Sequence, residues 1–196
     1  MSTREIATDE RAVRASSGPV LGMVLFVASE AMFFAAFFGA YFTIHATQSV
    51  WPPKGIEHLK IGIPAILTVT LVSSSVVLQI GLRTIRTSGP RRAMVFLGAT
   101  IVLGITFLLL QLYDYSQLGF GLKDGVFGTL FYVMTGLHMA HVFGGVVFLS
   151  LVFGQTASGL LSPTRHESLE AGTLYWHFVD VVWICLFTVF YLLTPR

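Results

Sequence analysis

Residues 126–154 read VFGTLFYVMTGLHMAHVFGGVVFLSLVFG, a run of apolar side chains without a single Asp, Glu, Lys or Arg. A helix needs about 20 mostly apolar residues to cross the hydrocarbon core of a bilayer. The run is long enough for one tilted spanning helix and too short for two helices with a connection. It therefore predicts an integral membrane protein.

Four further apolar runs extend this pattern along the chain. Residues 61–82 and 93–113 carry no charged side chain, and only Glu30 and Asp180 interrupt residues 19–44 and 174–193. The whole chain is 11% charged with a mean hydropathy of +0.76, whereas a soluble domain carries about 25% charged residues. The sequence thus predicts an all-α membrane domain of five transmembrane helices over residues 18–196.

Residues 1–17 precede this domain and mix acidic with basic side chains. The apolar run that follows is too long for the core of a secretory signal, which spans about 7–15 residues. We expect residues 1–17 to form a poorly ordered cytoplasmic tail.

The distribution of Lys and Arg predicts the orientation, because cytoplasmic loops carry the excess of basic residues. Eight fall on the side of the N-terminus and four on the other side. We expect the N-terminus in the cytoplasm and the C-terminus outside. The eight are Arg4, Arg11, Arg14, Arg83, Arg86, Arg91, Arg92 and Arg165, and the four are Lys54, Lys60, Lys123 and Arg196. The net charge of +2 is spread over the loops and indicates no nucleic-acid surface.

Five ionisable residues lie inside the predicted spans, where such a group needs a partner or a function. At about 1.5 Å per residue, Glu30 and His141 come to similar depths near the membrane centre, with His138 one turn further out. We expect a Glu30–His141 hydrogen bond between spans one and four, with His138 as second choice. His177 and Asp180 are shallower and share one face of span five, since they are three residues apart.

On the residues alone, three roles stay open for this set. The histidines could bind a metal or haem, since imidazole is a common ligand, but two of the three lie on one helix face. A proton pathway needs titratable groups across the whole bilayer, and here they stop near the middle. Hydrogen bonding between helices is the reading that the chemistry alone favours. The lone Cys185 allows no intrachain disulfide.

Small residues at four-residue spacing mark close helix contact in lipid. Gly136, Ala140 and Gly144 form such a ridge. We expect spans four and five to touch through this ridge or its neighbours. The hydroxyls of residues 73–75 in the second span indicate bundle packing.

Several motifs in order along the chain resemble subunit III of the haem-copper cytochrome c oxidases. They run from about residue 18 to the C-terminus, and the most specific are those of the last two spans. They are SEAMFF (29–34), WPPKGI (51–56), LLQ (109–111) leading to Asp114-Tyr115, DGVFG (124–128), TGLH (135–138) with His141, EAG (170–172) and YWHFVDVVW (175–183).

This resemblance implies a five-helix subunit in the bacterial cytoplasmic membrane with no catalytic residue, haem, copper or other metal of its own. Haem and copper belong to partner subunits I and II, alone or in a respiratory supercomplex. It also implies bound phospholipid and a supporting role near proton uptake, where Glu30 matches the family's carbodiimide-reactive carboxylate.

The resemblance implies further site residues and two departures. Trp176, His177 and Asp180 form the motif of the last helix, and Trp51, Asp114 and Glu170 are expected to contact lipid or partner subunits. The long form of the family has seven helices, of which this chain matches the last five, so it cannot complete the lipid cleft alone. Asp114 stands where a Glu is expected.

Three alternatives remain beside this assignment. Related subunits serve quinol oxidases and nitric oxide reductases, and a small channel or transporter is a further possibility. The missing stripe of polar residues across the membrane argues against the last of these.

Overall fold

The computed structural model describes residues 3–53 and 59–194, with the backbone alone for residues 3–17. Within these ranges five long helices follow one another, and each contains a stretch long and apolar enough to cross a membrane. The predicted all-helical, five-span fold is confirmed. The helices are α1 (Thr3–Thr47), α2 (Gly62–Ser88), α3 (Pro90–Gln117), α4 (Gly125–Ala157) and α5 (Glu167–Phe187), which continues into the short π-helix η1 (Thr188–Leu192).

Most helices extend past the apolar runs that predicted them. The second span was predicted to end at residue 82, but α2 continues to Ser88 and ends only at Gly89, whose φ of 89° is open to glycine. Pro90 then starts α3, since its missing N–H costs nothing in the first helical turn. Backbone hydrogen bonding thus extends the helices beyond the apolar stretch.

α1 begins at Thr3, and the poor order expected of residues 1–17 stays a prediction.

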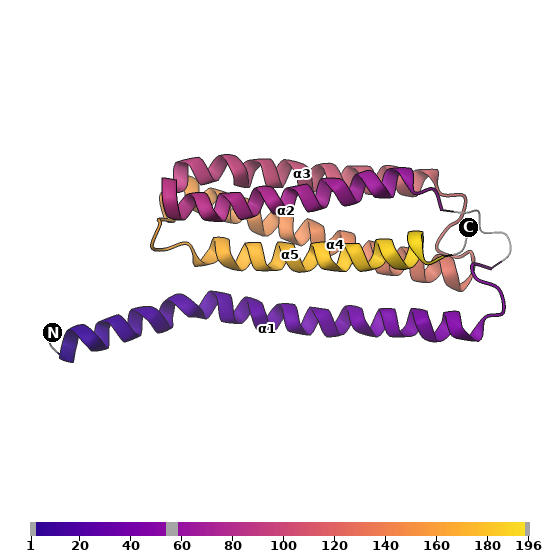
Figure 1. Cartoon of the computed structure of the whole chain (residues 1–196), viewed down its shortest axis with the longest axis horizontal. Coiled ribbons are helices and arrows are strands. Elements are labelled where there is room, and N and C mark those ends of the chain that lie inside the picture. The colour runs from indigo at the N-terminus through magenta and orange to yellow at the C-terminus, as the bar shows by residue number, and fades with distance from the viewer. Residues whose placement is uncertain (1–2, 54–58, 195–196) are drawn as a thin grey trace.

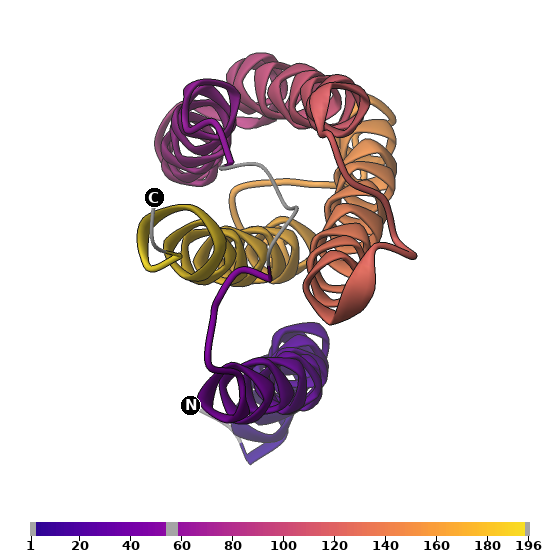
Figure 2. The same ribbon diagram turned by 90° about the vertical axis from the view of Figure 1, so that its right-hand side faces the viewer.

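Helices α2 to α5 form a bundle, and α1 lies along one side of it (Figure 1). Seen from the end, α1 packs beside α5 and reaches α4, while α2 and α3 lie across the bundle from it (Figure 2). Aromatic side chains fill the bundle core, and α1 buries only Phe34 and Tyr41 among its described residues. The largest fully buried side chains include Trp176, Trp183, Phe107, Phe127, Phe131 and Phe190.

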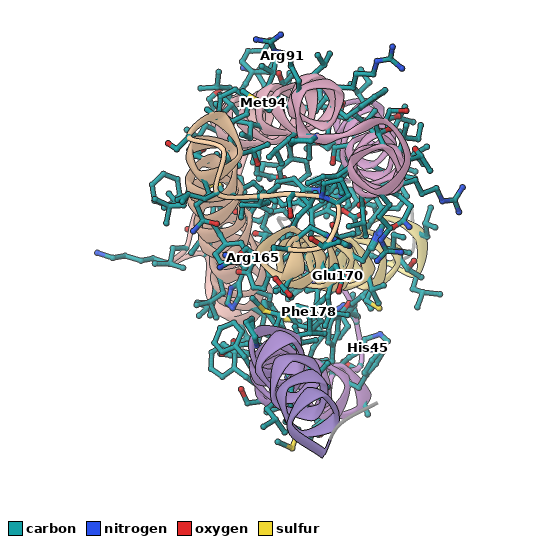
Figure 3. The ribbon with its side chains drawn as sticks, turned by 90° about the vertical axis from the view of Figure 1, so that its left-hand side faces the viewer. His45, Arg91, Met94, Arg165, Glu170 and Phe178 are labelled. Carbon is teal, nitrogen blue, oxygen red and sulfur yellow. The ribbon has the colours of Figure 1, made fainter. Side chains whose placement is uncertain are left out.

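The start of α1 and the end of η1 lie at opposite ends of the molecule (Figure 1). The α2–α3 turn and the α4–α5 connection share the N-terminal end, and Figure 3 shows Arg91 and Arg165 there. The arginines near these two connections therefore lie at one end of the molecule, as the orientation predicted from the Lys and Arg count requires. Lys54 and Arg196, two of the four basic residues of the other side, lie outside the described residues.

The contact between α4 and α5 is made at Gly145, the residue next to the end of the predicted small-residue ridge. A Cβ on Gly145 would lie 2.9 Å from the Trp176 ring, whereas one on Gly136 would meet nothing within 4 Å. Gly144 lies at the edge of the contact, 3.7 Å from the Tyr175 hydroxyl by the same measure. The contact thus runs through a neighbour of the ridge, because the Trp176 indole needs a surface without a side chain.

Candidate functional site

Glu30 on α1 and His141 on α4 form a hydrogen-bonded pair. The Glu30 Oε2 and His141 Nε2 atoms are 2.9 Å apart, so the predicted bond is confirmed. The two side chains are 21% and 16% exposed on the isolated chain. The pair therefore joins α1 to the bundle, and both of its side chains stay partly exposed at the surface of the chain.

The other ring nitrogen of His141 decides how many protons the pair holds. Nδ1 lies 2.7 Å from the carbonyl oxygen of Leu137, and since a carbonyl only accepts, Nδ1 must donate. The bond between Nε2 and Glu30 then holds one proton, as a carboxylic acid donating to a neutral ring or as an imidazolium donating to a carboxylate. Either form is neutral overall, which suits a site among apolar helices better than a lone charge.

Aromatic side chains surround the pair. The Phe34 ring meets His141 edge-on at 5.0 Å between centroids, and the Tyr175 hydroxyl donates to the His141 carbonyl at 3.0 Å. Phe178 lies between α5 and α1 (Figure 3), and its ring centroid is 6.3 Å from that of Phe34. No sequence signal pointed to the bond between Tyr175 and α4.

An apolar hollow of about 250 Å³ lies beside the pair. Helices α1, α4 and α5 all contribute to its wall, and Phe26 and Gly144 are each within one helical turn of the paired residues. The lining residues are Met23, Phe26, Gly144, Phe148 and Tyr175. Its apolar lining suits a hydrocarbon chain.

The polar residues of α5 face α2 instead. The Ser75 hydroxyl donates to Asp180, and the Trp176 indole N–H donates to the Ser74 hydroxyl at 2.8 Å. His177 and Trp183 reach the same helix, at Gln79 (3.3 Å) and Thr68 (3.0 Å). The shared face of His177 and Asp180 is thus used for helix contact, and the serines of α2 are its partners.

His138 lies apart from the Glu30–His141 pair. Its ring stacks on Trp183 at 5.2 Å and meets the edge of Phe107 at 5.8 Å. Neither ring nitrogen has a hydrogen-bond partner in the part of the chain that the structure describes. The second-choice bond from His138 to Glu30 is therefore not formed.

The three residues expected to contact lipid or partners each tie two segments of this chain together. The Trp51 indole donates to the Tyr41 hydroxyl at 3.0 Å, and the Tyr191 hydroxyl donates to Asp114 at 3.4 Å. Glu170 pairs with Arg86 on α2 and lies 3.1 Å from the His166 ring. A contact of any of the three with lipid or another subunit stays a prediction.

The membrane histidines do not converge on a common point. His141 bonds to Glu30, His177 to Gln79, and His138 stacks on Trp183. Among the described residues no three His, Cys, Asp or Glu side chains are placed to hold a metal ion together. This arrangement can hold a proton and join helices.

Comparison with known proteins agrees with the motifs. The family model described as cytochrome c oxidase subunit III matches residues 4–194. A protein of Thermostichus vulcanus is 39% identical over 89% of this chain and 87% of its own length, and one of Synechocystis is 40% identical over 89% and 75%. One of Locusta migratoria is 38% identical over 90% and 69%. All three carry the name cytochrome c oxidase subunit 3, so the comparisons do not favour the quinol oxidase, nitric oxide reductase or channel alternatives.

Proposed function

This chain belongs to the cytochrome c oxidase subunit III family, and from that premise we propose that it carries no redox chemistry and supports the catalytic subunits beside it. Its partners would be oxidase subunits I and II, within the cytoplasmic membrane of a bacterium and with its N-terminus inside. Cyanobacterial relatives support the bacterial setting. A respiratory supercomplex would be the larger assembly.

The absence of redox chemistry in this chain is supported by how its membrane histidines are used. His141 is hydrogen-bonded to a carboxyl group, and His177 is hydrogen-bonded to an amide. His138 stacks on an indole ring. Imidazole is a common metal ligand, but a centre held by several histidines needs rings that converge on one point, and these three rings face different helices. We therefore assign the haem and copper of the complex to its other subunits.

The observation that carries the supporting role is the Glu30–His141 pair. It holds one proton, both residues lie near the middle of their candidate spans, and both side chains keep an exposed edge. Because the proton can reside on either partner, the pair can pass it to a neighbouring group and take up another without exposing a lone charge to lipid. We assign to it the support of proton uptake in the adjoining subunit.

Bound phospholipid is the second part of the proposal. The apolar hollow beside the pair has room for part of an acyl chain, and the described part of α1 buries few of its apolar side chains. An acyl chain in the hollow would keep water away from Glu30 and His141. The pair would then exchange its proton only with a group of the adjoining oxidase subunit.

The proposal is tested by preparing the oxidase with and without this chain. Removal should leave the visible haem spectrum intact and lower sustained turnover and proton uptake. A tagged chain should co-purify with catalytic subunits that contain the haem. Loss of the haem signal while the catalytic subunit remains at normal levels would contradict the proposal.

A further inference from the structure

Two polar side chains lie buried between α3 and α4 without a hydrogen-bond partner among the described residues. They are Gln111 on α3 and His138 on α4, each 1% exposed. The amide of Gln111 and both ring nitrogens of His138 are unpaired. Burying such groups unpaired costs about 1–3 kcal/mol each, so a partner is expected.

The register of the two antiparallel helices places these side chains at the same level. The Tyr115 hydroxyl lies 2.7 Å from that of Thr135. Four residues from Tyr115 along α3 is Gln111, and four residues from Thr135 along α4 is position 139, next to His138. One residue corresponds to about 1.5 Å along a helix, so Gln111 and His138 leave their helices at nearly the same level.

Their faces agree as well as their levels. Gln111 is four residues from Phe107 and therefore on the same face of α3, and the Phe107 ring contacts His138. Both side chains thus point into the same part of the bundle core.

We propose that Gln111 and His138 hold an ordered water molecule between α3 and α4. A buried water typically makes about three hydrogen bonds to polar groups that lack other partners. The amide offers a donor and an acceptor, and a neutral imidazole offers one of each. One water can bond to the Gln111 amide and to one ring nitrogen of His138, so it gives each side chain a partner.

A high-resolution structure of the intact oxidase complex is the first test. We expect an ordered water within about 2.7–3.2 Å of the Gln111 amide and of a His138 ring nitrogen. A direct bond between the two side chains, or a dry contact with no water there, would overturn the proposal.

Radiolytic labelling of the same complex in ¹⁸O-water is the second test, because hydroxyl radicals form where water resides. His138 should take up label although its side chain is buried, and an unlabelled His138 in the wild-type complex would overturn the proposal without any variant. Gln111→Leu should abolish the label at His138. The control Gln117→Leu, an exposed glutamine on the same helix, should retain it, and equal labelling in the two variants would also contradict the site.

Discussion

Gly104 on α3 is a position where one added methyl group should destabilise the bundle core. In Gly104→Ala the new Cβ would lie 2.7 Å from the Trp176 ring and 2.8 Å from a Val146 methyl group. Carbon atoms pack best at about 3.5–4.0 Å. Trp176 cannot withdraw, because it is fully buried, bonded to Ser74 and seated on Gly145.

Two opposing terms set the size of the effect. Overpacking a filled core costs about 1–3 kcal/mol, and replacing a mid-helix glycine by alanine returns about 0.5–1 kcal/mol. We expect a net loss of about 1–2 kcal/mol, which is a factor of about 5–30 in the folded-to-unfolded ratio.

The assay is the denaturant midpoint at which the tagged chain unfolds and leaves the purified complex. Gly136→Ala is the matched control, since its Cβ would meet nothing within 4 Å, and it should be neutral or slightly stabilising. If Gly104→Ala has the same midpoint as Gly136→Ala, the packing of Trp176 described above is incorrect.

Two further predictions concern orientation and the α2–α5 contact. A cysteine placed at Ser88, on the exposed end of α2, should resist labelling by a membrane-impermeant reagent in intact cells and react once the cells are opened; labelling from outside would invert the orientation. Ser75→Ala removes the bond to Asp180 and leaves its carboxyl group with no partner there, so the chain should lose about 1–3 kcal/mol of stability. The exposed neighbour Ser73 provides the control, because Ser73→Ala should change the denaturant midpoint little, and equal shifts in both variants would refute the role of the Ser75 bond.

The Glu30–His141 bond could be predicted from the sequence because it depended on depth alone. Both residues interrupt long apolar runs, and counting along two antiparallel spans brought them level. A helix has a fixed rise per residue, so the depth of a residue can be predicted without knowing how the helices are rotated about their axes.

Contacts that depend on helix rotation could not be predicted in the same way. His138 and His141 share a face by spacing, yet the first turns to Trp183 and the second to Glu30. Four-residue spacing identified a small-residue ridge, but only the position of the Trp176 indole shows that Gly145 makes the contact. Ser75 and Asp180 are 105 residues apart in sequence, and nothing local pairs them.

The central claim is that the pair serves the oxidase through its shared proton, and Glu30→Gln tests it most directly. The Gln amide can still donate to His141 Nε2, so the helix contact stays while the exchangeable proton is lost. Ser29→Ala, which changes an exposed hydroxyl bonded only to its own helix, is the control. Sustained turnover and proton uptake of the purified complex are the readouts. We predict that Glu30→Gln keeps the haem spectrum and the denaturant midpoint and loses turnover in a prolonged assay, while Ser29→Ala matches the wild type. Full turnover and proton uptake in Glu30→Gln throughout that assay would contradict the claim and reduce the pair to a structural bond.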